Sequence, residues 1–174
     1  EILIGLVGSE MCIRDSVNGD GITELPRAVL MAGYKDTSSS DAVYMLDWYA
    51  YGIGKVPTKV ATTYQNISDA WSLLIDQKWH DRITAIKVSD GGLSYVEFFE
   101  YRKNKMSIPL FNIYCATGSN REYYAERTDL IQLGQTTQAI YFAKLTNEGE
   151  QSELALTGDE IKARFSLVNQ AWNN

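Results

Sequence analysis

The stretch SVNGDGITE at residues 16–24 has the residue types and spacing of a calcium-binding loop. Calcium takes about six to eight oxygen ligands, and acidic or amide side chains that alternate along a tight loop converge on one centre. The candidate ligands are Asn18, Asp20, the backbone carbonyl of Ile22, and Glu24. Ser16 occupies the first ligand position, where a carboxylate is expected, so we expect any calcium binding to be weak.

The residues after this loop decide which kind of calcium site it resembles. An EF-hand or dockerin loop needs an acid at its twelfth place, but that place is Arg27, preceded by Pro26. The shorter loop, closing at Glu24 and leading into a strand, resembles the calcium loops of FG-GAP-type β-propeller blades. A hairpin turn is the alternative, because Asn-Gly and Asp-Gly favour positive φ without a metal.

Other groups able to do chemistry do not form a recognisable set. His80, the only histidine, is followed by Asp81, and we interpret it as an exposed corner residue at a strand end. A glycosidase needs two facing carboxylates, but the spacing of the candidates selects no pair and predicts solvated positions. These candidates are Asp47, Glu97, Glu100 and Asp129. The P-loop, nucleophile-elbow, zinc-protease and Cys-x-x-Cys motifs are absent from the sequence.

Aromatic side chains offer a different type of site. Strand aromatics pack mostly in cores and across strands, yet an exposed set could bind a sugar or a protein surface. The residues considered are Trp48, Tyr49, Tyr51, Tyr95, Tyr123 and Tyr124. Such a platform is the alternative that best suits a domain without catalysis.

Composition restricts the class of protein. The 174 residues carry a formal net charge of −6 and 45% hydrophobic residues, which predicts a globular chain and no nucleic-acid partner. No apolar run is long enough to span a membrane. Of the two cysteines, Cys115 lies in an apolar run and is predicted to be a buried core residue.

The sequence divides into three predicted segments. Residues 6–16 resemble a translated sequencing-adapter artefact, so residues 1–16 are interpreted as a non-native leader. Residues 17–65 predict a β-meander or partial propeller blade, whose first alternating segment ends at Pro26. Residues 66–174 predict an α+β domain made of an antiparallel sheet and a C-terminal helix packed on it.

Within the last segment, patterning predicts the individual elements. Alternating segments joined by SDGG and RKNK turns predict successive hairpins, and a short helix is predicted over 120–127. Thr157 and Glu160 have capping-box spacing and open a helix predicted over 157–172. Its apolar stripe would consist of Ile161, Phe165, Val168 and Trp172.

Several stretches together give the chain a family resemblance. They are VNGDGITELPRAV, DWYAYG, TTYQN, WSLLIDQKWHDRITA, FFEY and LTGDEIKARFSLV. With them, residues 17–170 resemble the C-terminal part of uncharacterised surface lipoproteins of Gram-positive gut bacteria, in which an FG-GAP/VCBS-type propeller precedes an α+β domain. The element order of the last segment is also similar to the PsbP/Mog1-like fold.

The resemblance implies export and tethering through an N-terminal lipidated cysteine outside this chain. It carries no known reaction. We therefore expect a non-catalytic extracytoplasmic module that binds or assembles with a cell-envelope component, either glycan or protein. The alternatives are a carbohydrate-active enzyme accessory or hydrolase domain, and a purely structural domain.

Overall fold

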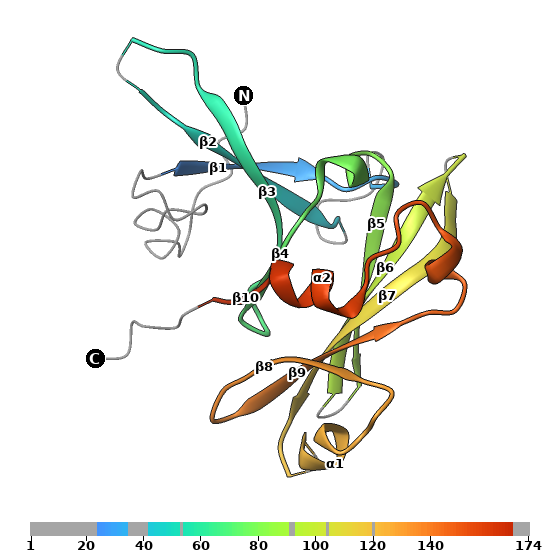
Figure 1. Cartoon of the computed structure of the whole chain (residues 1–174). Helices are drawn as coiled ribbons and strands as arrows, with labels where there is room; N and C mark the ends of the chain where they lie inside the picture. Colours follow the sequence, from blue (N-terminus) through green and yellow to red (C-terminus); the bar gives the residue numbers. More distant parts are fainter. Residues whose placement is uncertain are drawn as a thin grey trace.

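A computed structural model describes residues 24–34, 42–52, 54–90, 93–103, 105–119 and 121–168. Two five-stranded antiparallel sheets account for most of these residues (Figure 1). The first sheet has the order β1-β2-β3-β4-β10 and the second the order β5-β6-β7-β9-β8. The chain is therefore rich in β-structure, as its alternating segments predict.

The first sheet is built mainly from the N-terminal half of the described chain. Its strands are β1 (Glu24–Leu30), β2 (Tyr44–Ala50), β3 (Thr58–Asn66), β4 (Trp71–Leu74) and β10 (Phe165–Leu167). Residue 65 lies inside β3, and β4 and β10 complete the sheet that β1 to β3 begin. The residues on both sides of the predicted segment boundary thus share one sheet.

The prediction that the first strand ends at Pro26 was wrong. Pro26 lies within β1 and pairs with Trp48 of β2. Proline cannot donate to a ladder, but β1 is the edge strand of its sheet and needs partners on one side only.

The second sheet is a set of hairpins. Its strands are β5 (Ile83–Asp90), β6 (Leu93–Arg102), β7 (Lys105–Thr117), β8 (Ile131–Gln135) and β9 (Ala139–Leu145). Asp90 pairs with Leu93 and Arg102 pairs with Lys105, which confirms the two predicted hairpin connections. β8 was not predicted, because its short sequence, IQLGQ, contains a glycine and alternates weakly.

Two short helices complete the regular structure, together with 3₁₀ turns at Gln77–Trp79 and Gly149–Gln151. Helix α1 (Arg121–Ala125) lies within the predicted range. Helix α2 (Gly158–Arg164) begins with the predicted capping box: the Thr157 hydroxyl accepts from the Glu160 amide, and Glu160 accepts from the Thr157 amide at 2.8 Å. No helix of the described residues has the length and hydropathy to cross a membrane.

The predicted helix over 157–172 was wrong in its second half. Phe165 has extended backbone angles and starts β10, so Phe165 and Val168 do not belong to a helical stripe; Trp172 lies outside the described residues. The Phe165 ring instead packs on Trp71 and Tyr141, with ring centroids 5.9 and 5.7 Å apart. Pairing with β4 and this aromatic packing outweigh the helical periodicity.

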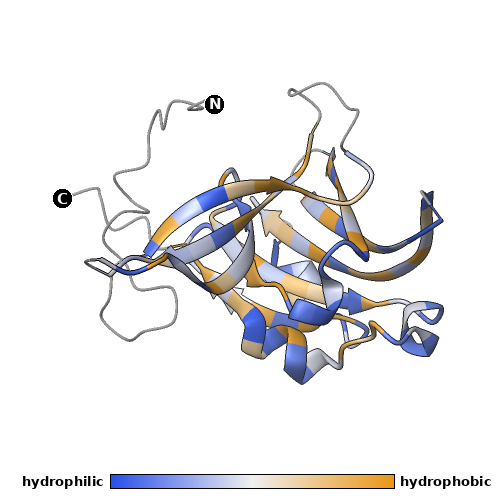
Figure 2. Cartoon of the chain, turned by 90° about the horizontal axis from the view of Figure 1, so that it is seen from above, coloured by the Kyte–Doolittle hydropathy of each residue, from blue (hydrophilic) through white to orange (hydrophobic). Residues whose placement is uncertain are grey.

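One large hydrophobic core connects the two sheets and α2. Figure 1 shows α2 between the sheets, where it contacts β4, β8 and β9, and its Ile161 is fully buried. Phe98 stacks on Phe111 at 4.8 Å, and the Trp79 indole donates to the Leu154 carbonyl at 3.1 Å. Several strands alternate between apolar and polar residues in Figure 2, which is what a sheet with one buried face requires.

Candidate functional site

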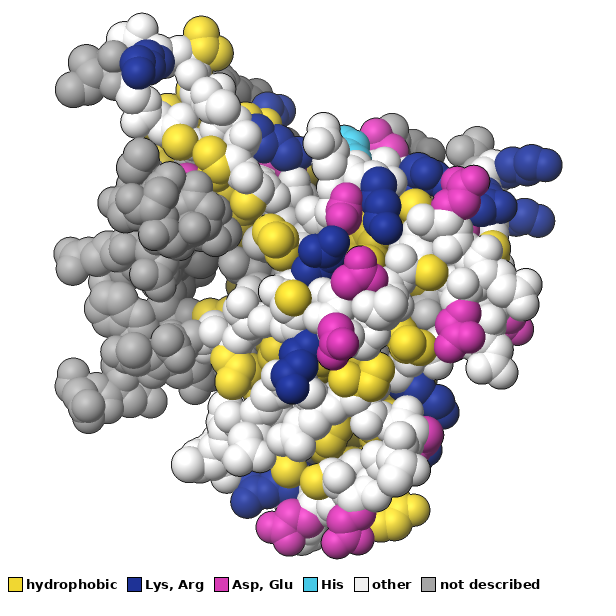
Figure 3. All heavy atoms as spheres, viewed as in Figure 1, with side chains coloured by type: hydrophobic (Ala, Val, Ile, Leu, Met, Phe, Trp, Pro, Cys, Tyr) yellow, Lys and Arg dark blue, Asp and Glu magenta, His cyan; other side chains and the backbone are white. Residues whose placement is uncertain are grey.

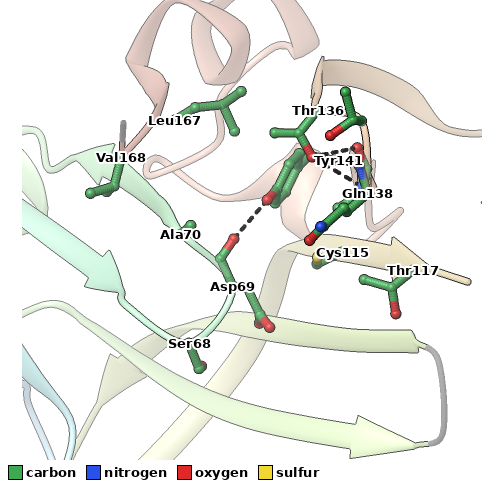
Figure 4. Close-up of a pocket in the computed structure, with 12 residues that line it drawn as sticks. Ser68, Asp69, Ala70, Cys115, Thr117, Thr136, Gln138, Tyr141, Leu167 and Val168 are labelled. Carbon is green, nitrogen blue, oxygen red and sulfur yellow. Dashed lines mark hydrogen bonds between the residues drawn. The ribbon is translucent and has the colours of Figure 1, made fainter. Parts of the chain in front are cut away.

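A cavity of about 380 Å³ opens where the two sheets meet (Figure 4). Its lining comes from the β3–β4 turn, the end of β7, the β8–β9 connection and the residues that close β10. The lining residues are Ser68, Asp69, Ala70, Cys115, Thr117, Thr136, Thr137, Gln138, Ala139, Tyr141, Leu167 and Val168. The volume lies within the range of about 300–1,000 Å³ that is typical of small-molecule sites.

The β3–β4 turn places a carboxylate at this cavity. Asp69 Oδ2 accepts hydrogen bonds from Asn66 Nδ2 at 2.7 Å and from Ser94 Oγ at 2.9 Å. Lys87 Nζ lies 3.9 Å from the same oxygen and also donates to Asn66 Oδ1 at 3.1 Å. Among the described residues, the side-chain hydrogen bonds to this carboxylate reach Oδ2.

The same turn is conformationally strained. Ala70 has a φ of 55°, a left-handed conformation that costs a non-glycine residue about 1 kcal/mol. Its amide donates to the Ile67 carbonyl, and its carbonyl accepts from the Val168 amide at 2.9 Å. The Tyr141 hydroxyl donates to the Asp69 carbonyl at 2.8 Å. Contacts from β9 and from the end of β10 therefore fix the turn in place.

The opposite wall of the cavity is the short connection between β8 and β9. The Thr136 hydroxyl accepts from the backbone amides of Gln138 and Ala139 at 3.2 and 3.0 Å. Arg121 of α1 donates to the Thr137 carbonyl at 2.6 Å. In Figure 4, Gln138 reaches into the cavity from the side opposite Asp69. The cavity thus holds a carboxylate and an amide on two rigid walls.

Two titratable groups on the cavity wall are poorly suited to catalysis at neutral pH. Burial, followed by the charge of Asp69, raises the pKa of the Cys115 thiol to about 11. Burial and the neighbouring Cys115 raise the pKa of Tyr141 to about 12. A catalytic cysteine needs a lowered pKa, so the Cys115 thiol is not activated as a nucleophile at neutral pH.

The predicted calcium loop lies almost wholly outside the described residues. Four of the five candidate residues lie outside the described residues: Ser16, Asn18, Asp20 and Ile22. Glu24, the last candidate ligand, is the first residue of β1 and is fully buried. Within the described ranges, no three His, Cys, Asp or Glu side chains are grouped to hold a metal.

The four candidate carboxylates do not come together. Asp47 lies on β2 and binds Lys59 at 2.7 Å, whereas Glu97 and Glu100 lie on β6. Asp129 precedes β8 and is exposed, and Arg127 lowers its pKa to about 2. The prediction of solvated positions was wrong for two of them, because Asp47 is 6% exposed and Glu100 is 0% exposed.

Glu100 is buried because a local network compensates its charge. Arg102 Nε donates to it at 2.5 Å, the Ser152 hydroxyl donates at 2.7 Å, and Arg82 lies 3.6 Å away. Burial by itself raises the pKa of Glu100. The hydrogen bonds from Arg102 and Ser152 and the two guanidinium charges lower it by more, so the pKa lies below its ordinary value. This network is structural, since Ser152 also accepts from the Leu154 amide.

The other predicted residues are dispersed over the molecule. His80 is exposed in a turn, as expected, with Nδ1 3.1 Å from Asp81 Oδ2. Trp48 is buried and donates to Thr63, whereas Tyr51 and Tyr123 are exposed. Three of the six aromatics lie on β2 and just after it, in the first sheet, whereas Tyr95 lies on β6 of the second sheet and the other two on α1, which contacts β7 and β9. Cys115 is buried, as predicted.

Sequence reasoning missed Asp69 and Gln138, two polar residues that line the cavity. The Asn-Ile-Ser-Asp run at 66–69 is a turn signal, and a carboxylate held by three neighbours could have been noted there. Nothing in the sequence links this turn to Gln138.

No family model, curated protein or solved structure matches the chain.

Proposed function

We propose that this chain is a non-catalytic binding module, whose site is the cavity between Asp69 and Gln138. The observation that carries the proposal is the cavity itself. It has a suitable size, its walls are held by internal hydrogen bonds, a carboxylate lines it, and burial keeps its thiol protonated at neutral pH. Pockets with a few fixed polar groups recognise ligands by orientation.

We also propose the cellular setting that the sequence resemblance implies. The chain would be the extracytoplasmic C-terminal part of a lipid-anchored surface protein of a Gram-positive bacterium, and its partner a cell-envelope glycan or protein. Residues 17–65 would derive from a propeller blade, and residues 66–174 from an α+β domain similar to the PsbP/Mog1-like fold. The complete gene should then encode a lipobox and further D-x-N-x-D-G loops.

A hydrolase is the weaker alternative. It requires two carboxylates facing one substrate, whereas Asp47, Glu97 and Asp129 lie on separate elements. Among the described residues, Asp69 is the one carboxylate that lines the cavity. These placements support the binding module over the enzyme.

The substitution Asp69→Asn tests the binding site. An asparagine that turns its oxygen toward Asn66, Ser94 and Lys87 keeps the internal bonds but presents an NH₂ donor in place of the acceptor Oδ1. We expect affinity for solubilised envelope fragments, measured by titration calorimetry, to fall at least about tenfold, which is ~1.4 kcal/mol.

A matched control for this test is Asp81→Asn. The Asp81 side chain is 72% exposed and lies outside the cavity, and its φ of 57° suits asparagine. The affinity of the Asp81→Asn variant for the same envelope fragments should equal that of the unmodified chain. If both variants bind equally well, or if no envelope fraction binds at all, the proposed site is wrong.

The calcium loop is a separate proposal with its own test. Ser16→Asp restores a charged first ligand to the sequence SVNGDGITE, so we expect it to increase calcium affinity at least about tenfold. Titration calorimetry with CaCl₂ on the two chains measures this difference. Identical heats in the two titrations would favour the hairpin turn.

A further inference from the structure

A second cavity adjoins the binding cavity and extends it. It measures about 470 Å³ and shares Thr117, Thr137 and Gln138 with the first. Its remaining lining comes from the turn after β7 and from α1: Gly118, Ser119, Arg121 and Glu122. Because they share three lining residues, the two cavities lie side by side, and we call the surface they form, from Asp69 to Glu122, the groove.

The groove carries little net charge. Asp69 at one end has Lys87 3.9 Å from its Oδ2. At the other end, Arg121 and Glu122 line the same cavity and have opposite signs. Charges of both signs are also interspersed on the face seen in Figure 3. A strongly charged ligand would therefore gain no long-range attraction along this groove.

Hydrogen-bonding side chains line the groove over its whole length. Hydroxyl and amide groups come from Ser68, Thr117, Ser119, Thr136, Thr137 and Gln138. Apolar lining from Cys115, Leu167 and Val168 is restricted to the first cavity. None of the described residues that line the second cavity has an apolar side chain, although an extended peptide relies on such pockets or on a sheet edge.

From these features we infer that the groove binds a neutral oligosaccharide, with one sugar unit in each cavity. Sugar hydroxyls both donate and accept, which matches a mixed lining of hydroxyls and amides, and an apolar sugar face suits the inner end of the first cavity. The inference rests on the proposed function, because it needs the first cavity to be a binding site.

The test combines ligand length with a variant that fills the second cavity. The full chain is screened on an array of neutral and acidic oligosaccharides and short peptides, and a neutral ligand is then titrated as mono-, di- and tetrasaccharide. Ser119 is exposed in the turn after β7, so Ser119→Trp should occupy the second cavity without disturbing the core. Ser107→Trp, at an exposed serine near the other end of β7, is the control.

We expect the disaccharide to bind at least about tenfold more tightly than the monosaccharide, with little further gain for the tetrasaccharide, and Ser119→Trp to remove this difference while Ser107→Trp preserves it. Binding that is independent of length but abolished by Asp69→Asn would overturn the inference and leave the proposed function intact. Binding only to acidic glycans or to peptides would also overturn it. If nothing binds, including envelope fragments, both fail together.

Discussion

The buried carboxylate of Glu100 would destabilise the fold if it had no partners, but its hydrogen bonds and ion pairs offset the cost of its burial. It lies on the core-facing side of β6, between the guanidinium groups of Arg82 and Arg102. Burying an unpaired carboxylate would destabilise the fold, so the partners must fold together with it. A sequence shows that a strand contains Glu, but not that two arginines from different segments compensate it.

Replacing this carboxylate should destabilise the chain. Glu100→Gln removes the charge between two arginines and weakens the bond to Ser152, and we expect a loss of about 2–4 kcal/mol in the free energy of unfolding. Urea denaturation measures the loss. The control Glu97→Gln, on the opposite face of the same strand, should change stability by less than about 0.5 kcal/mol.

The same network should make stability depend on pH. The pKa of Glu100 is lower in the folded chain than its ordinary value of 4.5, so its contribution is complete above that value and is lost as pH falls through the lowered folded pKa. Between about pH 6 and pH 3, the unmodified chain should lose more stability than Glu100→Gln. Parallel losses in the two chains would show that Glu100 carries no such linkage.

Cys115 should be an unreactive thiol. It is 3% exposed and its pKa is raised to about 11, so its thiolate is scarce at neutral pH. In a Cys12→Ser background, we expect alkylation by iodoacetamide at about pH 8 to be at least about 100-fold slower than for an exposed cysteine. Mass spectrometry follows the modification, and denaturant should restore a normal rate. Fast labelling of the folded chain would contradict the assignment of a protonated, buried thiol.

At the level of elements, α2 is short but well defined. It has a complete capping box, ends where Phe165 enters β10, and is anchored by Arg164, which donates to Asp76 at 2.8 Å. Hydrogen bonding from the Thr157 amide and hydroxyl lowers the pKa of Glu160. Such a helix depends on its cap and its packing, because its length alone gives little stability.

Removing the cap should therefore have a measurable effect. Thr157→Ala deletes the hydroxyl that accepts from the Glu160 amide, and we expect a loss of about 1 kcal/mol and a fall in Tm of about 2–4 °C. Differential scanning calorimetry measures the shift. Thr128→Ala, at an exposed threonine in a turn, is the comparison and should leave Tm unchanged. An equal Tm for both variants would mean that the cap does not stabilise α2.

Local sequence patterns predicted which helices and strands form better than they predicted the residues at which those elements begin and end. The β-prone apolar run in IYFAKL and the turns at SDGG and RKNK predict a strand and hairpins correctly, because residue preference and turn chemistry are local properties. The helix end at Arg164 and the strand through Pro26 depend on neighbours that the sequence does not reveal: the pairing of β10 with β4, and the edge position of β1.

At the level of the whole molecule, the site arises where the two sheets meet. Asp69 lies in the turn between β3 and β4 of the first sheet, and Cys115 and Tyr141 lie on strands of the second. Val168, which follows β10, donates its amide to the Ala70 carbonyl. None of these residues forms a motif, so the site could not be predicted from spacing along the chain. The predicted calcium ligands, in contrast, form a local motif that stays a prediction.

The most direct test of the central claim is to map the binding surface by nuclear magnetic resonance. Amide shifts of the ¹⁵N-labelled chain are recorded while solubilised envelope glycan is added. We expect the largest amide shift changes at residues 66–70, 115–119 and 136–141, and we expect Asp69→Asn to suppress them. Shifts concentrated elsewhere, for example on β2 and β3 away from the cavity, or no shifts at any concentration, would contradict the claim.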